Sequence, residues 1–471
     1  MDKALAILIT LLTYKVTLIV IGVWASKRTK NEADFFLGGK RLGPLVAAIS
    51  ASASSSSAWT LLGVSGAAFT WGLSAVWLFP ATVLGFLFNW SFIGPRLMRL
   101  SRSGGQLTLS EVIAGNPGHR LFQTNIRVCA TIILFSFAFY VASQFQAAGN
   151  AFATTFDLGI NESILIGGGI IVLYTLLGGF WAVSVTDTLQ GLLMAAAAVL
   201  LPVAALVAVG GPGDLLAGLR DQDVPQLMRF SGARTGILAL GFIIGTLGIG
   251  LGYPGQPHVV NRYMALRDQD ALRIGRRIAM SWAVIVYSGM LVLGWCGRVL
   301  YQDSVLGEQV MLHAADALLP PVLAGIVIAA ILSAVMSTAD SQLLVAASSV
   351  AYDWRIKSVC QGESLLLTRV VVLILSVLAI CLAIFAPDTI FRRVLFAWAA
   401  VGSAFGPLVI LRVVGIEVRE GFILATLISG FGLTILLHSL PDTPGDILER
   451  LLPFVVAMLI ALAGRHYRES A

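Results

Sequence analysis

The sequence predicts an all-α integral membrane protein that contains two inverted repeats of five helices each. Of the 471 residues, 57% are hydrophobic and 12% are charged, whereas about a quarter of the residues in a soluble domain carry charge. Apolar runs of about 20 residues, long enough to cross a bilayer, recur from end to end. Small polar residues or Gly and Pro interrupt two of these runs. The composition leaves no room for a soluble domain of normal size.

Taken in order, the apolar runs predict about thirteen transmembrane helices joined by short loops. The expected ranges are 5–25, 43–70, 72–95, 119–150, 161–181, 188–209, 235–257, 278–300, 312–350, 366–386, 392–412, 420–438 and 451–464. Lys15 interrupts the first run, and no small-residue cleavage site precedes the basic cluster at Lys27, Arg28 and Lys30. We therefore expect a helix of the mature protein rather than a signal peptide. The pattern assigns no role to Lys15.

The basic residues predict the orientation of these helices. With the N-terminus outside, most of the 31 Lys and Arg residues fall in the inside loops. The positive-inside rule therefore favours an outside N-terminus and an inside C-terminus, which an odd number of spans requires. The net charge of +6 then reflects topology, and no nucleic-acid partner is expected. The bilayer itself is the expected large partner.

The two interrupted helices divide the chain. The second span contains the Ser-rich stretch 50–58, and the seventh contains the Gly- and Pro-rich stretch 245–257. Broken helices at matched positions of inverted repeats predict a transporter site at the bilayer midplane. Close helix packing at the Ser/Ala stripe and a simple Pro kink are the alternatives. The expected organisation is a single polytopic domain over 1–471, with a leading helix and loop (1–42), a first repeat (43–209), a second repeat (235–415) and two trailing helices (416–471).

Two carboxylates lie at membrane depth. An unpaired carboxylate in hydrocarbon costs several kcal/mol, so each is expected to meet a cation, a proton or hydrogen-bond donors. Asp187 falls near a predicted helix start, where a capping role is the alternative. Ser337, Asp340 and Ser341 share one helical face. These hard oxygen ligands suit an alkali cation or a proton far better than a transition metal.

The chain also resembles the sodium:solute symporter family, and within it the bacterial sodium/proline symporters. The similarity runs through nearly the whole chain, most clearly in Phe36 to Pro44, the Ser-rich stretch, Gly178 to Asp187, Gly252 to His258, Met336 to Thr338 with Gln342 to Val345, and Ala404 to Pro407. The resemblance implies a LeuT-like fold, alternating access and sodium-driven uptake of a small organic solute. It also implies a multi-pass protein of a bacterial-type inner (plasma) membrane that is not an enzyme and carries no cofactor besides Na+ as the coupling ion.

The resemblance implies three groups of site residues. The sodium site would use carbonyls of Ala53, Ser56 and Ala334 with hydroxyls of Ser337 and Thr338. A second cation region would involve Asp187, Ser337, Asp340 and Ser341. The solute pocket would be lined by Ser57, Ala58, Tyr140, Tyr253 and Pro257, with Ser55 and Ile249 beside them. The two tyrosines offer flat apolar faces with a hydroxyl each, and half-helix N–H groups can take a solute carboxylate.

Three positions depart from the sodium/proline symporters. Ser55 stands where they have an aspartate, Ile249 where they have a pocket tryptophan, and Asp340 where they have a small hydroxyl or apolar residue. One hypothesis is that Asp340 supplies the carboxylate missing at position 55. L-proline is the expected solute. Another amino acid, a monocarboxylate or a sugar acid, proton instead of sodium coupling, and a transporter-like solute sensor are the alternatives.

Overall fold

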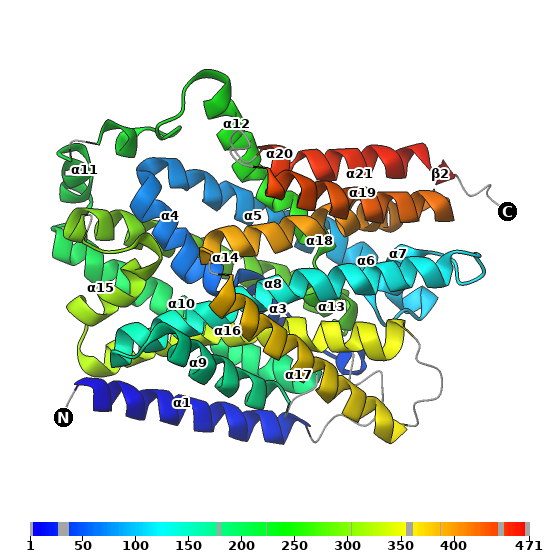
Figure 1. Cartoon of the computed structure of the whole chain (residues 1–471), viewed down its shortest axis with the longest axis horizontal. Coiled ribbons are helices and arrows are strands. Elements are labelled where there is room, and N and C mark those ends of the chain that lie inside the picture. Colours follow the sequence, from blue (N-terminus) through cyan, green and yellow to red (C-terminus); the bar gives the residue numbers. More distant parts are fainter. Residues whose placement is uncertain are drawn as a thin grey trace.

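The computed structural model describes residues 3–26, 37–176, 180–222, 224–302, 304–354, 361–386, 388–440 and 447–466. Within these ranges ten helices are long and apolar enough to cross a membrane. The described part is almost entirely helical (Figure 1). The basic cluster at Lys27, Arg28 and Lys30 and the Gly178–Gly179 pair lie outside the described residues.

Among the described residues, the first half of the chain contains eight longer helices. They are α1 (Lys3–Ser26), α3 (Pro44–Ala58), α4 (Val64–Trp71), α5 (Leu78–Phe88), α6 (Gly94–Gly104), α8 (Phe122–Phe156), α9 (Ile160–Thr175) and α10 (Phe180–Val209). The shorter elements are η1 (Gly38–Lys40), η2 (Trp59–Gly63), η3 (Gly72–Trp77), η4 (Asn89–Ile93) and α7 (Leu109–Ala114).

The described part of the second half also consists of helices and short helical elements. Its helices are α11 (Pro212–Arg220), α12 (Gly236–Leu247), α13 (Pro257–Ala265), α14 (Gln269–Tyr301), α15 (Val310–Leu318), α16 (Pro321–Ser348), α17 (Gln361–Phe385), α18 (Ile390–Val413), α19 (Glu420–Ser439), α20 (Ile447–Arg450) and α21 (Leu452–Ala463). The turns are η5 (Pro225–Met228), η6 (Gly248–Gly255), η7 (Gly307–Gln309) and η8 (Ser349–Asp353). Strand β1 (Glu417–Val418) pairs antiparallel with β2 (Arg465–His466).

Each predicted span overlaps a described helix, but several boundaries are corrected, and α14 begins at Gln269 and not at 278. The predicted range 312–350 is two helices, because Pro320 and Pro321 separate α15 from α16. The range predicted to begin at 188 begins at Phe180, so Asp187 lies about two turns inside α10 and not at its start. The capping role considered for Asp187 is therefore excluded.

Burial separates central helices from peripheral ones. In the most apolar window of each helix, 94% of α18 and 83% of α16 is buried, against 22% of α1. Helix α1 lies along one edge of the molecule, where it packs on α16 and α10 (Figure 1). The Lys3 end of α1 and strand β2 lie at opposite ends of the long axis (Figure 1). This agrees with an odd number of crossings, and the outside-in orientation stays a prediction.

Both predicted interruptions are real breaks. In α3 the break is at Ser57, with φ 54° and ψ −175°, a conformation that strains a non-glycine residue. In the second repeat the 3-10 turn η6 and the extended Gln256 (φ −84°, ψ 105°) separate α12 from α13. The Gly- and Pro-rich stretch is therefore more than a kink. Close packing at the Ser/Ala stripe also occurs, because a Cβ at Gly191 of α10 would lie 2.5 Å from Ile49.

Candidate functional site

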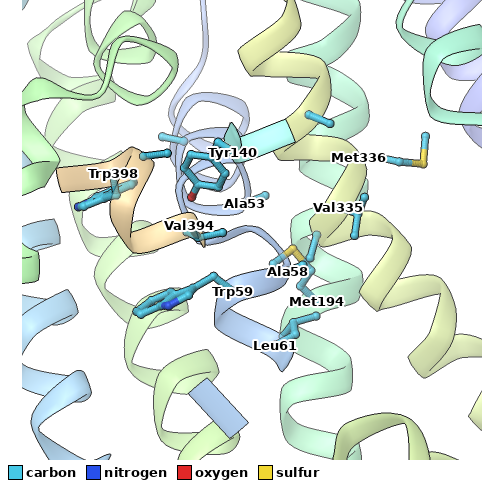
Figure 2. Packing of buried hydrophobic residues seen from close by; sticks show 14 of the residues in the cluster. Ala53, Ala58, Trp59, Leu61, Tyr140, Met194, Val335, Met336, Val394 and Trp398 are labelled. Carbon is cyan, nitrogen blue, oxygen red and sulfur yellow. The ribbon is translucent and has the colours of Figure 1, made fainter. Parts of the chain in front are cut away.

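The break in α3 exposes backbone groups that side chains satisfy. Ser57 Oγ accepts hydrogen bonds from the Trp59 N–H at 3.1 Å and from the Tyr140 hydroxyl at 3.4 Å. The Ala58 N–H donates to Gln144 Oε1 at 3.1 Å. Figure 2 shows Tyr140, Trp59 and Ala58 close to this break. Helix α8 thus holds the broken end of α3 through Tyr140 and Gln144, and three predicted pocket residues come together.

An aromatic cluster surrounds the second break. The Tyr253 ring packs edge-on against Trp398 of α18 at 4.7 Å and against Phe86 of α5 at 5.2 Å between centroids. The Trp398 indole N–H donates to the Ile249 carbonyl at 3.1 Å. A Cβ at Gly252 would lie 2.2 Å from Trp398 Nε1. Only a residue without a side chain allows this close approach.

Tyr287 of α14 connects the two breaks. Its hydroxyl lies 3.1 Å from Thr60 Oγ1, 3.5 Å from Ser56 Oγ and 3.5 Å from the Tyr253 hydroxyl. The sequence analysis missed Tyr287, Trp398 and Gln144. In the sequence, these three residues stand out only as polar or aromatic residues within apolar spans. That feature does not show which helices pack against one another.

The predicted pocket residues are enclosed by protein, because Ser57, Ala58, Tyr140 and Tyr253 are each at most 2% exposed. The cavity beside Ile249, Gly252 and Trp398 measures about 10 Å³, which is about the space of one water molecule. Pro257 borders a different cavity of about 20 Å³, together with Asn261 and Asp353. A solute therefore requires movement of the aromatic side chains around the breaks.

The predicted sodium ligands lie mostly where α3 packs against α16. The Thr338 hydroxyl donates to the Ser54 carbonyl at 3.1 Å, next to Ala53. The Ser337 hydroxyl donates to the Ala334 carbonyl at 3.3 Å. All of these residues are buried. The hydrogen-bond partners of Ser56 lie elsewhere, because its carbonyl accepts from Thr60 at 2.5 Å and its hydroxyl faces α14.

The second cation region contains a buried arginine. Arg262 of α13 forms a salt bridge of 3.0 Å with Asp187 and donates to Ser341 Oγ at 2.6 Å. Ser50 Oγ donates to Asp187 Oδ2 at 2.8 Å and accepts from Arg262 Nε at 3.1 Å. The two charged side chains are 1% and 0% exposed. Arg262 is therefore a buried residue of α13 and does not belong to a loop. Its position four residues after His258, in the second broken helix, was the available signal.

Asp340 does not share this ion pair. Its Oδ1 accepts from the Thr175 hydroxyl of α9, and its Oδ2 has no hydrogen-bond partner among the described residues. Thr338 faces α3, and two residues turn a helix by about 200°. Asp340 therefore points away from the first break. This geometry argues against the hypothesis that Asp340 replaces a carboxylate at position 55.

The comparisons with known proteins agree with this architecture. A profile of the sodium:solute symporter family matches residues 35–430. The chain is 35% identical over 460 residues to the high-affinity proline transporter PutP of Bacillus subtilis strain 168, with 94% of each chain covered. It is 36% identical over 440 residues to the sodium/proline symporter of Escherichia coli K12, which covers 90% of this chain and 86% of that one.

Solved structures define the fold class. A substrate-bound, outward-open Na+-coupled sialic acid symporter matches with a TM-score of 0.81 at 18% identity, over 98% of both chains. The transporter MhsT in complex with L-phenylalanine matches with a TM-score of 0.51 over 89% of this chain and 97% of that one. The fold is the LeuT-like inverted-repeat fold of a multi-pass plasma-membrane protein. With the family profile covering most of its length, the chain belongs to the sodium:solute symporter family.

Proposed function

We propose that this protein imports L-proline together with sodium by alternating access. The proposal depends on one observation, which is that the two broken helices meet beside Tyr140, Tyr253 and Trp398. Tyr287 connects the two breaks. Family membership supports sodium coupling, and relatives named as proline transporters support the solute. The two repeats proposed for this fold are residues 43–209 and 235–415, flanked by the leading helix and the two trailing helices.

Sodium is proposed to bind between α3 and α16. Carbonyls of Ala53, Ser56 and Ala334 and hydroxyls of Ser337 and Thr338 would replace its hydration shell. The hydrogen bond from the Thr338 hydroxyl to the Ser54 carbonyl, next to Ala53, supports this placement. Engaging Ser56 would require its carbonyl to take sodium in addition to Thr60. No cofactor other than the transported Na+ enters this proposal.

The solute is proposed to lie between the aromatic rings, with its carboxylate at the N–H groups after the Ser57 break. The Ala58 N–H, now bonded to Gln144, is one such donor. Ser55, Ser57, Ala58, Tyr140, Tyr253 and Pro257 would line or border the pocket. Ile249 lacks the indole found in proline symporters, but Trp398 supplies an indole against the Ile249 backbone. A tryptophan from α18 therefore supports a pocket for a small ring.

A competition panel in proteoliposomes tests the function. Labelled proline is offered with unlabelled amino acids, monocarboxylates and sugar acids, under an inward sodium gradient or under a pH gradient alone. We expect proline to accumulate only with sodium and to be displaced best by its own unlabelled form. Accumulation of a different solute would contradict the solute assignment. Uptake driven by the pH gradient without sodium would contradict sodium coupling, and binding without accumulation would indicate a sensor.

A further inference from the structure

Lys15 lies on the protein-facing side of α1. Residues Ile7, Leu11 and Leu18 are buried, and they recur at helical spacing along one face. The opposite face exposes Leu12, Val16 and Ile19, as a lipid-facing surface does. Tyr14 and Lys15 lie at the middle of the buried stripe. The Tyr14 hydroxyl bonds to Ser333 Oγ of α16 at 2.5 Å, and the Lys15 ammonium donates to Met336 Sδ.

Within the described residues, the Lys15 ammonium group donates to no strong neutral acceptor. A thioether sulfur is a weak acceptor, so the contact with Met336 does not account for a charge placed in the bilayer. Figure 2 shows Met336 on the side of α16 away from Tyr140 and Trp398. Asp340 follows Met336 by four residues on α16, so it lies about one turn from the Lys15 contact, on the same face of that helix.

The Asp340 carboxylate needs a positively charged partner. Its Oδ2 lacks a hydrogen bond within the described residues, and the Thr175 hydroxyl also reaches the Ile171 carbonyl at 2.9 Å. One hydroxyl proton serves these two acceptors, so Thr175 alone satisfies Asp340 poorly. Arg262, the other buried cation nearby, is already bonded to Asp187, Ser341 and the His258 carbonyl.

The two carboxylates therefore face two cations that belong to the protein. Asp187 is paired with Arg262 at 3.0 Å, and Asp340 lies one turn along α16 from Met336, which the Lys15 ammonium group contacts. A further monovalent cation would add uncompensated positive charge in a region of low dielectric, which is strongly unfavourable. The donor set of Asp187, Asp340 and Ser341 thus fits a sodium ion poorly while both basic side chains are present.

We propose that Lys15 is a tethered cation that takes, beside Asp340, the place of a transported sodium ion. Arg262 occupies the Asp187 and Ser341 side of the same region. This inference rests on the proposed sodium-coupled function and deepens it, because it leaves the α3–α16 site as the place for transported sodium. It also gives α1, which lies outside the two repeats, a part in setting the number of ions moved.

The test is the sodium-to-solute ratio, measured from reversal potentials of wild-type protein and variants in proteoliposomes. We expect about one sodium ion per solute in the wild type, and a rise toward about two in Lys15→Met, because Asp340 then recruits a free cation. Lys15→Arg keeps the charge and should retain the wild-type ratio. Lys3→Met, a matched change on the same helix at its exposed salt bridge with Asp316, should also leave the ratio unchanged.

A double variant keeps the test decisive if Lys15→Met fails to fold. Lys15→Met with Asp340→Asn removes both charges, so it should fold and return the ratio to about one. A wild-type ratio of about two, an unchanged ratio in a folded Lys15→Met, or a double variant that fails to fold would overturn the inference. These outcomes differ from failure of the proposed function, which would appear as wild-type protein that shows no sodium-driven uptake.

Discussion

At the scale of single residues, the most consequential contact is the ion pair between Arg262 and Asp187. It joins the second broken helix to α10, and Ser50 and Ser341 add bonds from α3 and α16. Four helices therefore meet at one buried charge pair. A buried pair adds little net stability compared with apolar side chains, but removal of one partner leaves a charge in the interior.

Arg262→Met should lower the stability of the protein because Asp187 is left unpaired, by about 3–5 kcal/mol. The measurement is the melting temperature in detergent, compared with Asp187→Asn/Arg262→Met. The double variant should recover most of the loss. If the single and double variants melt at the same lower temperature, the loss comes from packing and the ion pair has no special role.

At the scale of elements, different contacts hold the two breaks in place. Ser57 keeps α3 in a strained conformation, held by Tyr140 and Gln144 from α8. The second break depends on glycine, because η6 approaches α18 so closely that a Cβ at Gly402 would lie 2.6 Å from the Gly252 Cα. The shape of the pocket is therefore set by backbone contact between η6 and α18.

Gly252→Ala tests this contact. The added methyl group would overlap the Trp398 indole at 2.2 Å, whereas a Cβ at Gly248 of the same turn has no neighbour nearer than 3.8 Å. We expect Gly252→Ala to raise the KM for the solute by about tenfold through displacement of Trp398, and Gly248→Ala to leave it near the wild-type value. Equal effects of the two variants would mean that helix propensity, and not the position of Trp398, controls the pocket.

At the scale of the whole molecule, the buried fraction of a helix depends on whether that helix lies at the centre or at the edge of the bundle. Helices α16 and α18 are enclosed by other helices and carry the small residues and polar groups of the site. Helix α1 lies at the edge of the molecule and exposes apolar side chains such as Leu12, Val16 and Val20. Lys3 and β2 lie at opposite ends of the long axis (Figure 1). The positive-inside rule therefore predicts that the Lys3 end lies outside the membrane and the β2 end lies inside.

Labelling of single cysteines in a cysteine-free background checks the orientation. Ser304→Cys, after α14, should react with an impermeant maleimide in intact cells, because this exposed position lies on the predicted outside face. Ser103→Cys, near the exposed end of α6, should react only after permeabilisation. The reverse pattern would invert the topology while leaving the fold unchanged.

Local patterns were enough to predict the spans and both breaks. A Ser-rich stretch and a Gly- and Pro-rich stretch weaken a helix wherever the chain takes them, so Ser57 and Gln256 lie within the predicted ranges. The partners of these breaks were not predictable. Trp398 meets Ile249 across 149 positions of sequence, and Arg262 meets Asp187 across 75. A single sequence, read without an alignment of related sequences, carries no signal for such long-range pairs.

The sequence by itself determined that the protein is a helical membrane protein with two broken helices at matched positions, because hydropathy and backbone propensity are local properties. Only the tertiary structure decided which charges meet. It paired Asp187 with Arg262 and turned Asp340 toward Thr175 of α9. The physical reason is that the low dielectric of the interior makes each buried charge depend on its nearest neighbours, and helix packing alone selects those neighbours.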